Sequence, residues 1–226
     1  CGTDEDAHRQ YLNDWATGQF LGSNSRGELC REGKVCGTTA SLCGVEAADY
    51  EQNDTKLDQA VACDLLLHAF LLTQSGLPLL TCGDEVGQLN DYSYHEDPAR
   101  SGDARNLQHG PFQWELAAMR GDGETRQGKQ FQGLRRLEEL RVAEPAFDAR
   151  ANVWTFDTGN PHVLGVGRWY EGRKLVALFN FGGDFVTASA PEGGTFDELV
   201  YGGHYDEIGH VELYPYGFVW LLQQEA

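Results

Sequence analysis

The segment SGLPLLTCGDEVG, residues 75–87, is the most informative part of the chain. Its apolar run Leu77–Cys82 lies between two glycines, which predicts a short strand buried on both faces, as in a parallel sheet. Asp84 and Glu85 would then follow the carboxyl end of that strand, where ligand sites lie in barrels of parallel strands. The alternative is that both carboxylates cap the next turn.

A long amphipathic helix is predicted immediately before this segment, over Asp54–Gln74. Asp54 is the candidate N-cap, since its side chain can accept a backbone N–H. Apolar positions at spacings of four and three form one face; they are Leu57, Val61, Leu65, His68 and Leu72. On such a face we expect His68 to be a core residue and not a ligand. Helix, glycine turn and strand together make an αβ unit.

Further helices are predicted on both sides of this unit, over His8–Phe20, Thr38–Val45 and Glu124–Val142. Residues 83–112, between the strand and the last helix, are dense in Asp, Tyr, His, Asn and Arg. A loop of this length is uncommon inside a compact domain and usually has a function. We therefore expect binding residues in this polar segment.

From residue 150 the pattern changes to short stretches of strand character separated by glycine-rich turns. Two of them, Val163–Tyr170 and Lys174–Phe181, are separated by Glu-Gly-Arg and predict a hairpin. The others are Trp154–Phe156, Phe185–Ala188, Phe196–Val200, Val211–Leu213 and Phe218–Leu222. This spacing predicts an antiparallel β-sandwich. We place one domain over residues 1–149 and a second, all-β domain over 150–226.

The formal net charge is −18, which would repel a phosphate backbone or an anionic membrane surface. A neutral ligand such as a sugar suits this charge, although the acidic excess can equally serve solubility. No CxxC pair occurs among the six cysteines, so no metal or other cofactor is expected. No apolar run approaches the roughly 20 residues of a membrane span. Sparse cysteines favour a cytoplasmic location over a secreted one.

Several motifs resemble one family in the same order along the chain. The segment GLPLLTCGDEVG resembles the eighth-strand region of the α-amylase family, glycoside hydrolase family 13. Four further matches resemble its amylosucrase branch: HRQYLN at 8–13, GTTASLCG at 37–44, LNDYSY at 89–94, and DPA at 97–99 with DAR at 103–105. The resemblance implies an α/β fold: the C-terminal part of a TIM (β/α)8 barrel, with its last helices and eighth strand, followed by the antiparallel β-sandwich.

The resemblance also implies a retaining reaction on sucrose. A carboxylate attacks the anomeric carbon of the glucosyl unit, a carboxylic acid protonates the departing fructose, and glucose passes to an α-1,4-glucan, an oligosaccharide or water. In the family these acids follow the fourth, fifth and seventh strands, which would all precede residue 1. We therefore assign no catalytic residue here and expect the chain alone to be inactive.

Substrate-binding positions are carried over from the motifs one by one. Arg9 falls where the family has an arginine on the acceptor side, and Arg105 where an arginine closes the glucosyl pocket by pairing with an upstream Asp. Lys34 stands where the branch has an acceptor-side arginine, and lysine cannot bond a ligand in the bidentate way. The full predicted set is Arg9, Lys34, Glu85, Asp91, Asp103, Arg105 and His109. Without the resemblance, each arginine would be interpreted as part of a surface ion pair.

One departure from the family bears on the product. The family pattern Asp-x-Arg-Trp-x-His-Arg-Pro is replaced here by DARNLQHGP at 103–111, which lacks the Trp and the second Arg. The loss of a stacking surface and a charge favours hydrolysis or isomer formation over polymer elongation. Two other hypotheses remain open: a non-catalytic glucan-binding or scaffold protein derived from the α-amylase family, and another enzyme of that family. The LNDYSY stretch argues against the last.

Overall fold

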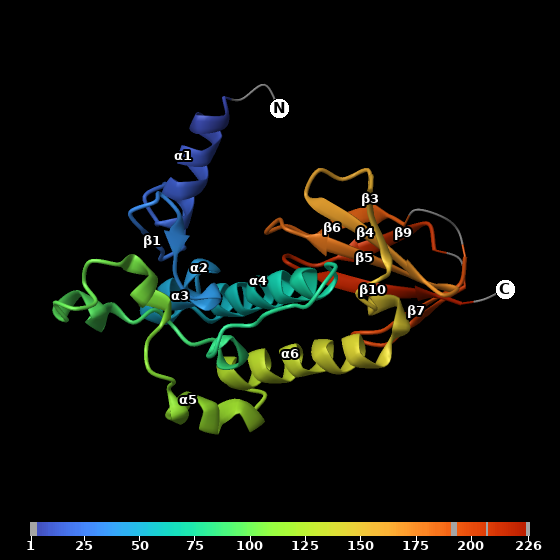
Figure 1. Cartoon of the computed structure of the whole chain (residues 1–226). Coiled ribbons are helices and arrows are strands. Elements are labelled where there is room, and N and C mark those ends of the chain that lie inside the picture. Colours follow the sequence, from blue (N-terminus) through green and yellow to red (C-terminus); the bar gives the residue numbers. More distant parts are fainter. Residues whose placement is uncertain (1–3, 191–193, 207, 225–226) are drawn as a thin grey trace. The chain divides into compact units, whose positions relative to one another are not determined.

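A computed structural model describes residues 4–190, 194–206 and 208–224 (Figure 1). These residues form two compact units, each made from two separate lengths of chain. The loop unit comprises the described residues up to Asp64 together with Thr81–Phe131. The sheet unit comprises Leu65–Leu80 and the described residues from Gln132 onward.

The loop unit consists of short helices, turns and one small hairpin. Its elements are α1 (Glu5–Ala16), β1 (Glu28–Leu29), β2 (Val35–Cys36), α2 (Thr39–Leu42), α3 (Val45–Glu51), η1 (Asp84–Val86), η2 (Tyr92–Glu96), η3 (Ala104–Gln108), α5 (Trp114–Ala118) and η4 (Met119–Gly121). The helices α4 (Asp54–Leu72) and α6 (Arg126–Ala143) begin in it and continue into the sheet unit. The helix predicted over Thr38–Val45 is α2, after which α3 starts at once.

Helix α4 occupies the predicted position, but its cap differs from the prediction. The side chain of Asn53 accepts the backbone N–H of Lys56 at 3.0 Å, so Asn53 is the N-cap and Asp54 is the first helical residue. Asn53 and Asp54 are adjacent and both are common N-cap residues, so the sequence predicted the cap one position too late. His68 is 3% exposed, which confirms its assignment to the core.

The strand predicted over Leu77–Cys82 is wrong for this structure. No strand is formed there, and none of the strands in the described ranges pairs with this segment. Leu77 and Leu79 are 89% and 86% exposed. An apolar run becomes a buried strand only where neighbouring strands satisfy its backbone hydrogen bonds. The segment has no such neighbour here, so it stays extended and open, and the barrel part of the predicted fold is not seen.

The sheet unit is an antiparallel structure. Its strands are β3 (Asn152–Phe156), β4 (Val163–Tyr170), β5 (Arg173–Asn180), β6 (Val186–Ser189), β7 (Phe196–Glu198), β8 (His204–Tyr205), β9 (His210–Leu213) and β10 (Phe218–Gln223), preceded by the turn η5 (Pro145–Phe147). Six of them form one sheet in the order β3-β4-β5-β10-β7-β8, and β6 pairs with β9 as a separate ribbon (Figure 1). Each described pairing is antiparallel.

The β4–β5 hairpin follows from its turn residues. Tyr170 pairs with Arg173, which leaves Glu171 and Gly172 as the two turn residues. Both have positive φ, 45° and 87°, as expected for the turn type whose twist matches the flanking strands. The strand β4 has the predicted bounds, and β5 begins and ends one residue earlier than predicted.

Two apolar clusters cover the two faces of the six-stranded sheet. On one face, α4, α6 and η5 contribute Leu66, Ala69, Leu72, Leu134, Leu137, Ala146 and Phe147, and the sheet contributes Val166, Leu175, Ala177, Phe179, Phe218, Trp220 and Leu222. On the other face, the β6–β9 ribbon packs through Ala188, Val211 and Leu213. The second layer opposite the sheet is thus a two-stranded ribbon and is smaller than a sandwich would require.

Arg168 is the most unusual residue of the first cluster, because it is charged and fully buried. Its guanidinium donates hydrogen bonds to the backbone carbonyls of Thr73, Ala146 and Asp148 and lies 5.7 Å from the ring centroid of Phe147. Burial lowers the pKa of Arg168 to about 10, so the side chain remains charged at neutral pH. These bonds connect the end of α4 and the turn η5 to the sheet.

Candidate functional site

The polar segment predicted to be a long loop, residues 83–112, is ordered by three short turns, η1, η2 and η3. Two of them begin with a carboxylate cap: Asp91 accepts the backbone N–H of Ser93, and Asp103 that of Arg105, each at 3.0 Å. These caps satisfy backbone groups that would otherwise need water. The density of Asp in this segment is therefore partly structural.

Asn90 connects the polar segment to the N-terminal part of the loop unit. Its backbone N–H donates to Ser41 Oγ at 3.0 Å, and its side-chain oxygen accepts the N–H of Thr38 at 2.9 Å. Its side-chain nitrogen donates to the carbonyl of Arg26. Since Asn90 is only 9% exposed, these bonds hold three chain segments together without competition from solvent.

Tyr92 and Tyr94 of the LNDYSY motif each donate to a glutamate elsewhere in the loop unit. Tyr92 bonds Glu46 at 2.8 Å, and the buried Tyr94 bonds Glu28. Burial raises the pKa of Tyr92 to about 12, and burial together with Glu28 raises the pKa of Tyr94 as well. Glu28 also lies 2.9 Å from Nε2 of His95. The motif is thus built into the framework of the loop unit.

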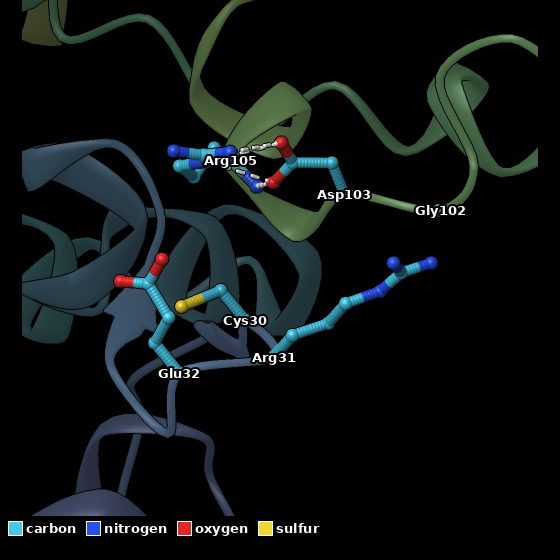
Figure 2. A pocket seen from close by; sticks show the side chains of 6 residues that line it. All are labelled: Cys30, Arg31, Glu32, Gly102, Asp103 and Arg105. Atoms are coloured by element: carbon cyan, nitrogen blue, oxygen red, sulfur yellow. Dashed lines mark hydrogen bonds and ion pairs between the residues drawn. The ribbon is translucent and has the colours of Figure 1, made fainter.

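A surface hollow of about 160 Å³ is the first of two candidate binding sites in the loop unit. It is lined by Cys30, Arg31, Glu32, Gly102, Asp103 and Arg105. Figure 2 shows Cys30 and Glu32 on one side of it and the Asp103–Arg105 pair on the other. The hollow presents charges of both signs and a thiol.

Asp103 and Arg105 form a bidentate ion pair at the rim of this hollow. The Nε–Oδ1 distance is 2.9 Å and the Nη2–Oδ2 distance is 2.6 Å. The hydrogen bonds from Arg105 lower the pKa of Asp103 to about 2, and the carboxylate in turn raises the pKa of Arg105. Both groups are therefore ionised at every physiological pH and can offer charged hydrogen-bond partners to a polar ligand.

A smaller polar hollow of about 30 Å³ lies where η1 approaches the start of α2. It is lined by Gly37, Thr38, Thr39, Thr81, Cys82, Gly83, Asp84, Gln88 and Gln108. Thr39 Oγ1 lies 3.3 Å from Asp84 Oδ1, and Gln108 accepts the N–H of Gly37 at 3.0 Å. Its size suits one hydroxyl group or one water molecule.

Asp84 was placed at a possible ligand site by the sequence but was not in the predicted binding set, and Thr39, Gln88 and Gln108 were missed. The amide and hydroxyl groups of these residues are the kind that recognise sugar hydroxyls. Gln88 and Gln108 both fall within the polar segment 83–112, so their position was a usable signal. Thr39 could have been found only through the GTTASLCG match.

Two predicted residues, Arg9 and Lys34, have local ion-pair partners. Arg9 lies on α1, with Glu5 and Asp6 at 3.0 and 3.6 Å, and its side chain is 61% exposed. Lys34 precedes β2 and lies 3.4 Å from Glu32. Neither Arg9 nor Lys34 lines either hollow, but Glu32, the ion-pair partner of Lys34, lines the larger one.

The remaining predicted residues occupy the polar segment. Glu85 accepts the backbone N–H of Gly83 at 2.8 Å, and Asp84 accepts that of Thr81 at 2.8 Å, so both carboxylates bond the backbone just before η1, which itself has no side-chain cap. Asp91 contacts Arg100 at 3.3 Å in addition to its cap. His109 is exposed at the end of η3. Only Asp103 and Arg105 of the predicted set share one hollow.

Three aromatic side chains form a partly exposed surface cluster near the N-terminus. Tyr11 and Trp15 of α1 lie 5.0 and 5.6 Å from Phe20, measured between ring centroids. The three residues are 44%, 41% and 41% exposed. The rings are inclined to one another by 34° to 74°, so a sugar ring could stack on the exposed face of one ring at a time.

Within ranges 4–190, 194–206 and 208–224, no group of three or more His, Cys, Asp or Glu residues has the arrangement of a metal site. None of the helices in these ranges combines the length and the apolar character that crossing a bilayer requires.

No protein-family model matches the chain. Solved structures do match it in fold. The trehalulose synthase MutB from Pseudomonas mesoacidophila MX-45 is 19% identical, with a TM-score of 0.56 over 71% of this chain and 38% of that one. An AmyP variant in complex with maltotriose is 19% identical, with a TM-score of 0.60 over 73% of this chain and 35% of that one. A MutB double mutant in complex with isomaltulose matches at 19% identity and a TM-score of 0.56.

The chain therefore has the fold of part of these sugar-binding proteins. It matches less than two fifths of their length, since 38% and 35% of those chains are covered. At this level of identity the likeness concerns the fold alone.

Proposed function

We propose that the chain is the C-terminal part of an α-amylase-family enzyme that acts on sucrose, most similar to an amylosucrase. Such an enzyme transfers a glucosyl unit from sucrose to an α-1,4-glucan, an oligosaccharide acceptor or water. The fold likeness to trehalulose synthase MutB and to AmyP supports the family. The ordered motif matches between residues 8 and 105 support the sucrose-acting branch.

The Asp103–Arg105 pair is the observation that carries this proposal. The pair belongs to the DAR motif and lines the larger hollow, and its two hydrogen bonds hold both charged groups in place. In the proposed enzyme, the planar guanidinium of Arg105 closes the glucosyl pocket by donating to an upstream carboxylate or to sugar hydroxyls. Lys34 and Arg9 would border the acceptor side, and His109 would contact sugar from the polar segment.

The proposed reaction retains the configuration at the anomeric carbon. A nucleophilic carboxylate forms a β-glucosyl-enzyme while a carboxylic acid protonates the departing fructose, and the acceptor then displaces the enzyme. The resemblance implies that these acids lie on other strands of the parent protein, and the role proposed for this chain is to bind and orient the substrate. Asp84 and Glu85 accept the backbone N–H groups of Thr81 and Gly83 and are not assigned to catalysis.

Sucrose turnover by the full-length parent protein, with products separated by chromatography, tests the proposal. We expect release of fructose and transfer of glucose to maltotriose or water, with hydrolysis or isomeric disaccharides exceeding long polymer. The 226-residue chain alone should release neither sugar. A parent protein that leaves both sucrose and maltotriose intact, or an isolated chain that turns sucrose over, would contradict the assignment.

A second candidate function is glucan binding without catalysis, which the exposed cluster of Tyr11, Trp15 and Phe20 favours. Under this hypothesis the chain alone binds maltooligosaccharides, and the Trp15→Ala variant loses most of that affinity. Trp169→Ala is the matched control, because Trp169 is 45% exposed but lies on β4 of the sheet unit. Calorimetric titration with maltoheptaose distinguishes the hypotheses, since binding without turnover by the parent protein favours this one.

A further inference from the structure

Two cysteines meet on the β1–β2 hairpin. The register pairs Glu28 with Cys36 and Leu29 with Val35, and the backbone N–H of Cys30 donates to the carbonyl of Lys34 at 2.9 Å. Cys30 and Cys36 are therefore diagonal neighbours on the same face of the hairpin. Side chains at diagonal positions on one face are close enough for long side chains to interact, and each thiol shifts the pKa of the other.

The two thiols have different surroundings. Cys30 is partly exposed and lines the larger hollow, whereas Cys36 is 5% exposed. Hydrogen bonds from the backbone groups of Glu32 and Lys34 lower the pKa of Cys30, and burial raises the pKa of Cys36. Cys30 is thus the more accessible and more readily ionised thiol, which suits it to attack first, and Cys36 is the protected second thiol.

We propose that Cys30 and Cys36 are a redox-active dithiol that closes to a disulfide by exchange with a small peptide disulfide of the glutathione type. The Cys30 thiolate attacks one sulfur of the small disulfide, a mixed disulfide forms, and one small thiolate leaves. Cys36 then loses its proton to solvent and attacks the Cys30 sulfur, which releases the second small thiolate. The two thiolates take up the two protons, so two protein thiols and one small disulfide become one protein disulfide and two small thiols.

The hollow gives the oxidant a place to react. Its lining holds two arginines and two carboxylates, and Arg105 is already paired with Asp103. Arg31 is therefore the cation that suits a carboxylate of a peptide disulfide, and Cys30 lines the same hollow (Figure 2). Closure brings the two sulfurs to about 2.05 Å and the two Cα atoms within about 7 Å. The hairpin has only two residues in each strand and the short connection 30–34, so little regular structure opposes this adjustment.

A second pair of thiols in the loop unit provides the contrast. The Cys63 thiol, together with burial, raises the pKa of Cys43 well above its ordinary value. A buried protonated thiol is a poor nucleophile. This pair should therefore stay reduced under conditions that oxidise Cys30 and Cys36.

The test is oxidation of the folded chain with oxidised glutathione, followed by alkylation, trypsin digestion and peptide mass spectrometry. Trypsin places Cys30 in residues 27–31 and Cys36 in residues 35–56, a peptide that also holds Cys43. We expect a disulfide link between these peptides in the unaltered chain and in Cys43→Ser. The link should be absent in Cys30→Ser, and in Cys36→Ser, where Cys30 should instead carry glutathione.

Reactivity gives an independent measurement on the unaltered protein. Under reducing conditions at pH 7, Cys30 should be alkylated by iodoacetamide at least about tenfold faster than Cys36, because the thiolate reacts and the thiol does not. Equal rates would overturn the assignment of roles. The proposal itself would be overturned if the disulfide between the two peptides still formed in Cys36→Ser or was lost in Cys43→Ser. It would also be overturned if no such disulfide formed under conditions that attach glutathione to Cys82.

Discussion

The guanidinium of Arg168 hydrogen-bonds the backbone carbonyl of Thr73, although 95 residues separate them in the chain. Thr73 follows the last turn of α4, and Arg168 lies inside the sheet on β4. The same guanidinium bonds the carbonyls of Ala146 and Asp148 at 2.8 Å each. One buried charge thus satisfies the carbonyls of a helix end and a turn that would otherwise be buried without partners.

Replacing this arginine should be costly. We expect Arg168→Met to lower the free energy of unfolding by about 3 kcal/mol, since three carbonyls lose their donor in the core. Arg168→Lys keeps the charge but loses the planar fork, so an intermediate loss is expected. Urea unfolding followed by circular dichroism measures both. Arg135→Met, at an ion pair whose side chains are 66% and 54% exposed, is the control and should change stability little.

Gly110 should tolerate no side chain. A Cβ at this position would lie 2.6 Å from Cβ of Asp91, the cap of η2. We expect Gly110→Ala to lower the free energy of unfolding by about 1–3 kcal/mol, because the polar segment must shift to relieve the overlap. The matched variant Gly121→Ala has open space at the same point, with nothing within 4 Å. Equal unfolding midpoints for the two variants would contradict the described packing of η2 and η3.

His204 should titrate above the ordinary range. Its Nδ1 lies 2.6 Å from Asp197 and its Nε2 3.3 Å from Asp206, and the hydrogen bond with Asp197 is the main cause of its raised pKa. Since the folded pKa exceeds the unfolded one, this contact stabilises the fold fully below the unfolded pKa. The stabilisation is lost as the pH rises through the folded pKa.

Proton NMR titration of the imidazole tests this relationship. Asp197→Asn should move the pKa of His204 downward and remove the corresponding pH dependence of stability. Glu212→Gln, an exposed carboxylate on β9, should leave the titration of His204 unchanged. A His204 titration that is the same in the unaltered chain and in Asp197→Asn would show that the pair does not form in solution.

In the proposed full-length enzyme, Arg105 can be tested by kinetics. Arg105→Ala should reduce kcat/KM for sucrose about tenfold to a hundredfold, the equivalent of one charge-assisted hydrogen bond. Arg105→Lys should recover part of the loss. Because the pKa of Asp103 is about 2, the contribution of the pair should not vary with pH between 5 and 9, within about twofold. Unchanged kinetics in Arg105→Ala would remove Arg105 from the binding site.

The outcome for the strands shows what local sequence can predict. Strand β4 was predicted to the residue, because an apolar stretch ends at a Glu-Gly turn that only one hairpin geometry accepts. The run Leu77–Cys82 has equally strong apolar character, yet it forms no strand here. Strand formation there depends on neighbouring strands, and a local pattern contains no information about whether they are present.

In the candidate site, too, local pairs could be predicted from the sequence and long-range contacts could not. Asp103 and Arg105 are two positions apart, so their pairing could be expected from local geometry, and they do share the larger hollow. Asn90 forms single hydrogen bonds with residues up to 64 positions away in the chain. The periodicity of the sequence contains no signal for such contacts. The thiol pair on the hairpin was missed because Cys30 and Cys36 lack the spacing of a known motif.

The chain passes between its two compact units three times, after Asp64, after Leu80 and after Phe131. A recombination crossover at any point within residues 65–131 would therefore split both units. Neither unit could be moved into another protein as one continuous segment. The two should be inherited together across related genes. By the same logic, one peptide-bond cleavage near the exposed Leu77 and Leu79 would leave two pieces that both units still hold together.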